Sequence, residues 1–211
     1  MLWMYAVCGL TMLVCLPFFL HYKKALRYKL AASFKTLGTL CAADLAFTAA
    51  VRLDQRCWIC FAALVLHAAA DYVLEFNLYI GAGLFMVGHI CYLSFFSVLF
   101  PVTGVHFFIV LCLLGIMAFV FWRWREQIGK RMVFFALYGV TLSVTCAFAI
   151  AGLTGHTLQG LLIAAGGALF FFSDSLLLGR LLFSASRTVD WIIMITYYAA
   201  QLLFGASCLL G

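Results

Sequence analysis

Charged residues are scarce in this chain. Only 9% of its 211 residues are Asp, Glu, Lys or Arg, whereas 67% are hydrophobic, and the mean hydropathy is +1.16. An ordinary soluble domain carries roughly 25% charged residues. Seven acidic and thirteen basic side chains cannot cover the surface of a 23.4 kDa globule. A water-soluble protein is therefore excluded, and most of the surface is expected to face lipid.

Proline and polar runs are also rare. With two prolines, the sequence excludes disordered arms, solenoid repeats and collagen-like structure. The nine cysteines are odd in number and scattered through apolar segments, which argues against a disulfide framework. Cys57 and Cys60 form the one C-x-x-C pair. It lacks the second pair that a tetrahedral metal site needs, so neither a metal nor another cofactor is predicted.

Long apolar runs dominate what is present. A spanning helix needs about 20 mostly apolar residues. We therefore predict an all-α integral membrane protein with a single domain over residues 1–211, a bundle of eight transmembrane helices. The predicted spans are 2–20, 30–51, 57–75, 77–97, 102–122, 132–151, 158–182 and 190–210. The first run lacks a basic start and a small-residue cleavage site, so we interpret it as a retained helix and not a signal peptide.

The basic residues predict the orientation, because retained positive charge marks the cytoplasmic side. Only Arg52 and Arg56 fall between spans on one side. The other side carries Lys23, Lys24, Arg27, Lys29, Arg123, Arg125, Lys130, Arg131, Arg180 and Arg187. Both termini are then expected outside the cytoplasm, in a bacterial plasma membrane or a eukaryotic endoplasmic reticulum. The net charge of +6 lies in short clusters, so no nucleic acid partner is expected; the oligomeric state is left open.

Ionisable side chains inside a span cost several kcal/mol unless they are paired or hydrated, so each is a candidate site residue. The predicted spans contain Lys35, Asp44, His67, Asp71, His89 and Asp174. A rise of 1.5 Å per residue places Lys35, Asp71 and Asp174 in one layer, roughly 6–9 Å from the cytoplasmic ends. Asp44 falls towards the opposite face. The acids at span ends, Asp54, Glu75, Glu126 and Asp190, are expected to be solvated or interfacial charges.

Two carboxyl groups in an apolar setting suit acid/base chemistry. In such sites one carboxyl acts as acid and the other as base, typically at an acid-labile ether or acetal carbon with an oxocarbenium-like transition state. No serine-nucleophile elbow, phosphate loop or His-Glu-x-x-His is present, which disfavours acyl transfer and zinc hydrolysis. The alternative is a purely structural role, in which each polar group only forms a hydrogen bond to a neighbouring helix. For His67 and His89 this alternative is as well supported as a functional role. For Asp71 and Asp174 it is less well supported, because buried carboxylates cost more free energy.

Several runs resemble a known family. The segments GALFFFSD at 167–174 and TYYAAQ at 196–201 closely resemble the YhhN-like lysoplasmalogenase family of eight-span membrane enzymes. ADYVL at 70–74 is similar to that family's Gly-Asp-x-x-Leu, and GHICY at 88–92 to its His-x-x-Tyr. Lys35 stands where the family has Lys-Pro, although Thr36 replaces the proline and Ala70 replaces the glycine. The likeness covers residues 30 to 205.

The resemblance implies hydrolysis of the vinyl ether of lysoplasmalogens to a fatty aldehyde and glycerophosphoethanolamine or glycerophosphocholine. The expected partners are the lysophospholipid substrate and the bilayer. Asp71 and Asp174 would be catalytic, with the acid and base roles unassigned. The residues expected to bind substrate are Lys35, His89, Tyr92, Ser173, Tyr197 and Gln201. The alternative is a proton-coupled transporter or channel that uses the intramembrane aspartates, which would need a polar path to both faces.

Overall fold

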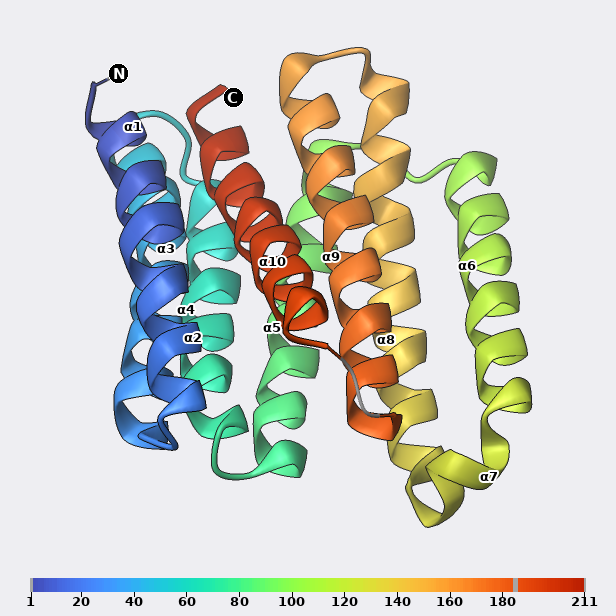
Figure 1. Cartoon of the computed structure of the whole chain (residues 1–211). Helices are drawn as coiled ribbons and strands as arrows, with labels where there is room; N and C mark the ends of the chain where they lie inside the picture. The colour runs from blue at the N-terminus through green and yellow to red at the C-terminus, as the bar shows by residue number, and fades with distance from the viewer. Residues whose placement is uncertain (1, 184–185, 211) are drawn as a thin grey trace.

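The computed structural model describes residues 2–183 and 186–210, and these residues fold into helices without a strand (Figure 1). Eight of the helical segments are long and apolar enough to cross a membrane, which confirms the predicted fold class. Residues 1 and 211, and residues 184–185 of the expected connection before the last span, lie outside the described part of the chain.

The described helices follow the predicted spans closely. The first span joins α1 (Leu2–Gly9), a π-helical turn (Leu10–Cys15) and α2 (Leu16–Lys24). The others are α3 (Tyr28–Arg52), α4 (Cys57–Leu74), α5 (Leu78–Leu99), α6 (Gly104–Arg123), the short α7 (Arg125–Ile128), α8 (Met132–Ala151), α9 (Leu158–Leu182) and α10 (Arg187–Ser207). Short 3-10 turns occupy Gly129–Arg131, Gly152–Gly155 and Cys208–Leu210.

Local chemistry explains where the helix ends differ from the prediction. The first span continues to Lys24, four residues past its predicted end, and Lys23 and Lys24 lie in its last turn, where cationic side chains favour the helix dipole. Pro17 is near the start of α2, directly after the π-helical turn, where its missing N–H is tolerated. Asn77 precedes α5 and caps it by accepting bonds from the amides of Tyr79 and Ile80 at 3.0 and 3.1 Å.

Six helices form a closed ring in the order α3, α4, α5, α8, α9 and α10, with α10 packed against α3 again. The other two long segments lie outside it: α2 packs on α3, and α6 packs on α8 (Figure 1). The burial of the spans agrees, since 17% of the α6 window is buried compared with 61% of the window in the last span. The ring interior is therefore the place where polar side chains are shielded from lipid.

Small residues let the ring close. The buried face of α3 is rich in alanine, including Ala42, Ala43, Ala46 and Ala49. Gly205 of α10 lies against the backbone carbonyl of Ala42 and has no room for a Cβ atom there. Small side chains permit this approach of two helix backbones, which stabilises helix pairs within a membrane.

The two ends of the bundle differ. The first and last described residues lie at one end, whereas α7 and the connections from α2 to α3 and from α4 to α5 lie at the other (Figure 1). The end with α7 carries the basic clusters of residues 23–29 and 123–131. The cytoplasmic location of that end stays a prediction.

Candidate active site

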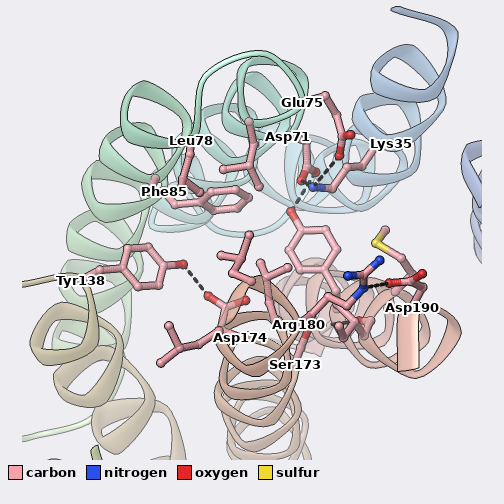
Figure 2. A pocket seen from close by; sticks show the side chains of 18 of the residues that line it. Lys35, Asp71, Glu75, Leu78, Phe85, Tyr138, Ser173, Asp174, Arg180 and Asp190 are labelled. Atoms are coloured by element: carbon pink, nitrogen blue, oxygen red, sulfur yellow. Dashed lines mark hydrogen bonds and ion pairs between the residues drawn. The ribbon is translucent and has the colours of Figure 1, made fainter. Parts of the chain in front are cut away.

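A cavity of about 390 Å³ lies at the end of the bundle opposite the termini. The Lys, Arg, Asp and Glu residues that line it are Lys23, Lys35, Asp71, Glu75, Asp174, Arg180 and Asp190. Figure 2 shows Asp71 with Lys35 and Glu75 on one wall, and Asp174 with Tyr138 on the other. The structure thus brings together the three residues that the helical rise placed in one layer: Lys35, Asp71 and Asp174.

Asp71 of α4 is fully buried and surrounded by donors from two neighbouring helices. Its Oδ2 accepts hydrogen bonds from the Thr39 hydroxyl at 2.5 Å and the Tyr197 hydroxyl at 2.8 Å. Its Oδ1 lies 3.2 Å from Nζ of Lys35. Two hydroxyl donors and one ammonium group favour the ionised form of this carboxyl group. The wall formed by α3, α4 and α10 therefore offers three donors to this carboxyl group.

Ion pairs continue from Asp71 to the surface. Nζ of Lys35 is also 3.8 Å from Oε1 of Glu75, and the same oxygen accepts a hydrogen bond from Nζ of Lys23 at 3.1 Å. The exposed fraction of the side chains rises from 0% at Asp71 and 8% at Lys35 to 49% at Lys23. Alternating charges thus extend from the buried carboxylate to the mouth of the cavity.

Asp174 of α9 has a different environment. Tyr138 of α8 donates its hydroxyl to Oδ2 of Asp174, whereas Oδ1 has no hydrogen-bond partner among the residues that the structure describes (Figure 2). No basic side chain of the described chain forms an ion pair with Asp174. A partly buried site with one neutral donor and no cation favours the protonated form more than the donors around Asp71 do. The two carboxyl groups therefore differ in their partners.

A second ion pair lies at the mouth. Nε of Arg180, in the last turn of α9, donates to Oδ1 of Asp190 in the first turn of α10 at 2.8 Å. Both side chains are partly exposed, at 40% and 35%. Figure 2 shows this pair at the same end of the cavity as Glu75 and Lys35.

The remaining wall is apolar. Away from the ion pairs the cavity is lined by side chains of α5, α6 and α8, among them Leu78, Ala82, Phe85, Met117, Phe135 and Leu142. Met117 reaches the cavity from α6, the helix outside the ring. The cavity is thus amphipathic, with ion-paired side chains on one side and an apolar wall on the other.

The other predicted site residues take two positions. Ser173 and Tyr197 line the cavity, although the Ser173 hydroxyl donates to the Ile193 carbonyl at 3.0 Å. His89, Tyr92 and Gln201 do not line it. Tyr92 donates to Oε1 of Gln201 at 2.7 Å, and Nε2 of Gln201 is 2.8 Å from Nδ1 of His67.

This deeper cluster is fully inside the ring. His67 and His89 have ring centroids 5.0 Å apart, and the His89 ring lies 4.9 Å from Phe170 and 6.1 Å from Tyr138. Both ring nitrogens of His89 and Nε2 of His67 lack a hydrogen-bond partner in the described part of the protein. The substrate-binding role predicted for His89, Tyr92 and Gln201 stays a prediction, and their geometry places them behind the cavity wall.

Some residues that line the cavity were not predicted from the sequence as site residues. Glu75 was expected to be a solvated or interfacial charge, but its side chain is only 5% exposed and is paired with Lys23 and Lys35, so it is not solvated. Tyr138 stands in an apolar run without a polar neighbour that would single it out. The helix period offers one signal for Glu75, which follows Asp71 by four residues and so shares its face.

Polar groups elsewhere do not converge on a metal site. No group of three His, Cys, Asp or Glu side chains within residues 2–183 and 186–210 is placed to hold an ion. The thiols of Cys57 and Cys60 donate to the carbonyls of Cys208 and Phe204, both at 3.7 Å. These contacts tie α4 to the end of α10.

Two acids lie away from the cavity. Asp44 is exposed on α3 and does not line it. Asp54, in the connection between α3 and α4, accepts a hydrogen bond from Nε of Arg56 at 2.7 Å. This bond lowers the pKa of Asp54 below the ordinary value for aspartate. Both residues serve below as controls for changes within the cavity.

Comparison with known proteins gives one family. The model described as the YhhN family matches residues 30–208, which include every helix of the ring. No curated protein and no solved structure gives a match.

Proposed function

This chain belongs to the YhhN family, and we propose that it is a membrane hydrolase that cleaves the vinyl ether bond of lysoplasmalogens. One observation carries the proposal: the fully buried carboxyl group of Asp71 and the partly buried one of Asp174 have different partners and face the same cavity. Acid/base pairs are built from such contrasts of environment. An amphipathic cavity also suits a lipid with one chain and a polar head.

The different surroundings of Asp71 and Asp174 support one assignment of the acid and base roles. Asp174, which has one neutral donor on Oδ2, is the acid and carries its proton on Oδ1. Asp71, which is paired with Lys35 and hydrogen-bonded by Thr39 and Tyr197, is the base. Lys35 then holds the charge of Asp71, and its place between the carboxylates of Asp71 and Glu75 suits this role better than the substrate contact expected from the sequence.

The proposed reaction has two steps, the addition of water to the vinyl ether and the breakdown of the resulting hemiacetal. Asp174 gives its proton to the outer vinyl carbon, and the inner carbon becomes an oxocarbenium ion that the Asp71 carboxylate stabilises. Asp71 takes a proton from a water molecule while the oxygen of that water bonds to the inner carbon, which gives a hemiacetal. In the second step the hemiacetal hydroxyl returns a proton to Asp174, while Asp71 protonates the departing glycerol oxygen. The products are a fatty aldehyde and the glycerophospho head group, and both aspartates regain their starting forms.

The position of the charges supports hydrolysis over transport. A proton-coupled transporter needs polar groups that lead to both faces. The charged lining of this cavity lies at one end, and Asp44, the acid that the sequence places within a span towards the other face, is exposed on the outside. The deeper histidine cluster has aromatic neighbours and no charged partner among the described residues.

The proposal is tested with purified protein in detergent. A lysoplasmalogen and its saturated ether analogue are incubated separately, and fatty aldehyde is measured. We expect aldehyde from the vinyl ether alone, because the saturated ether has no double bond to protonate. Ion flux in proteoliposomes without aldehyde release would replace the proposal with transport.

A further inference from the structure

Two hydrogen bonds, one helical turn apart, join α4 to α10. In the first, Tyr197 donates its hydroxyl to Oδ2 of Asp71 at 2.8 Å. In the second, Nε2 of Gln201 lies 2.8 Å from Nδ1 of His67. The partners on each helix are four residues apart and so share a face. The pairs run in opposite order along α4 and α10, as in antiparallel helices, so the His67 bond lies directly behind the bond that holds Asp71.

A third residue sets the direction of the deeper bond. Tyr92 of α5 donates its hydroxyl to Oε1 of Gln201 at 2.7 Å, so the other end of the amide presents an N–H to His67. Nδ1 of His67 is then the acceptor, and the single imidazole proton is on Nε2. All three side chains are fully buried. Because no water replaces a lost partner there, removal of the acceptor leaves the Gln201 amide unpaired.

Packing also fixes the imidazole ring. A Cβ atom on Gly88 of α5 would lie 2.2 Å from Cδ2 of His67, so the ring uses the space that this glycine leaves free. The rings of Phe85 and Phe170 have centroids 4.8 and 5.4 Å from that of His67. The same two rings lie 6.2 and 5.5 Å from the ring of Tyr197. A shift of the imidazole therefore reaches Tyr197 through packing as well as through α10.

We propose that His67 is a positioning residue that orients the carboxyl group of Asp71 through α10. Its bond to Gln201 sets the register of α10 against α4, and that register places the Tyr197 hydroxyl on Asp71. His67 itself does not line the cavity. The use of this orientation in catalysis rests on the proposed function, in which Asp71 is the base. A misplacement of a reacting group by about 1 Å costs on the order of 10²-fold in rate, so a residue behind the cavity wall affects turnover.

Two substitutions at position 67 separate the hydrogen bond from the bulk of the side chain. His67→Asn keeps an oxygen acceptor in place of Nδ1, whereas His67→Leu fills the site without an acceptor. We expect His67→Leu to lower kcat on the order of tenfold with KM nearly unchanged, because the residue does not touch the cavity. His67→Asn should recover most of this loss. Aldehyde release from lysoplasmalogen, with the full-length protein in detergent, gives both constants.

Two further variants control for stability. Gly88→Ala keeps His67 but forces its ring to move, so it should lower kcat as His67→Leu does and keeps the test usable where His67→Leu fails to fold. Cys60→Ala removes another bond between the same helices, from the Cys60 thiol to the Phe204 carbonyl at 3.7 Å. It lies about two turns from His67 and should leave kcat unchanged. Thermal unfolding shows the stability of each variant.

Infrared spectroscopy tests the orientation without any turnover. The carboxyl band of Asp71 is the band that Asp71→Asn removes. His67→Leu should shift this band, because the Tyr197 hydroxyl is displaced from the carboxyl oxygen, whereas His67→Asn and Cys60→Ala should leave it in place. The band that Asp54→Asn removes comes from a carboxylate between α3 and α4, and no change at position 67 should move it.

The outcomes separate this inference from the function it rests on. An unshifted Asp71 band in both His67→Leu and Gly88→Ala overturns the positioning role, even where aldehyde is released. Equal losses of kcat in His67→Asn and His67→Leu, or the same loss in Cys60→Ala, reduce His67 to packing and overturn it as well. A band that shifts as expected in a protein without aldehyde release supports the orientation of Asp71 by His67 and removes the hydrolase proposal alone.

Discussion

Asp71→Asn and Asp174→Asn are expected to abolish vinyl ether hydrolysis through different physical losses. An amide can neither give up a carboxylic proton nor take one, so each change should lower turnover on the order of 10²-fold or more. If the two groups act as one acid/base unit, the double variant should cost little more than either single change. Aldehyde release from lysoplasmalogen, at matched protein amounts, measures all three.

Stability should tell the two variants apart. Asp174→Asn replaces a neutral carboxylic acid with a neutral amide beside Tyr138, so its effect on the free energy of unfolding should stay within about 1.5 kcal/mol. Asp71→Asn removes a buried carboxylate 3.2 Å from Lys35. Loss of one partner of a buried pair costs about 3–5 kcal/mol, and Glu75, 3.8 Å from Lys35, should keep the cost near the lower figure.

A compensating change sharpens the test. Lys35→Met in the Asp71→Asn background removes the stranded ammonium group and should recover part of the lost stability, but not the activity. Thermal unfolding in detergent gives the stability arm. Asp44→Asn, on the exposed side of α3, and Cys57→Ser, which can still donate to the Cys208 carbonyl, should behave as wild type in both assays. Wild-type turnover by Asp174→Asn would refute its role as acid, and recovered turnover in Lys35→Met/Asp71→Asn would refute Asp71 as base.

The remaining predictions concern topology, metal and chain length. Cysteines introduced into the basic clusters at 23–29 and 123–131 should react with thiol reagents added from the cytoplasmic side. A cysteine at position 211 should react only from the opposite side, and cytoplasmic labelling there would contradict the orientation. A chelator should leave turnover intact because the cavity residues form no metal site among the described residues, and loss restored by one divalent ion would replace Asp71 with a metal as the activator of water. Met117→Trp should raise KM for long-chain substrates and leave short-chain turnover unchanged, because Met117 lies in the apolar part of the cavity lining and a larger side chain there shortens the space for the chain. Equal losses for both chain lengths would disprove a chain-binding role.

The spans and the depth of the key residues could be predicted from the sequence because both depend on distance along one helix. Apolar length between charged breaks locates a span, and the rise per residue placed Lys35, Asp71 and Asp174 at one level. Which helices are neighbours depends on packing between distant segments. The contact of Lys23 with Glu75 joins the first span to the third, and no local pattern indicates it.

The sequence also did not predict which of the polar side chains within the spans face the cavity. His89 and Gln201 are deep in their spans, as expected, but aromatic neighbours separate His89 from the charged mouth. Glu75 ends its span and resembles an ordinary interfacial acid, but in the fold Lys23 of α2 and Lys35 of α3 both pair with it. Depth therefore predicted the layer of the site, and tertiary packing decided which members of the layer face the cavity.

The ring order makes the two walls of the site independent of each other. Asp71 takes its partners from α3 and α10, whereas Asp174 takes Tyr138 from α8. Each carboxyl group thus takes its partners from its own wall, and the apolar space between them can open to a lipid without breaking either set of bonds. This separation also preserves the contrast in protonation, because Lys35 pairs with Asp71 and not with Asp174. A salt bridge from Lys35 to both acids would favour two carboxylates, and the cavity would then lack the proton that attack on a vinyl ether requires.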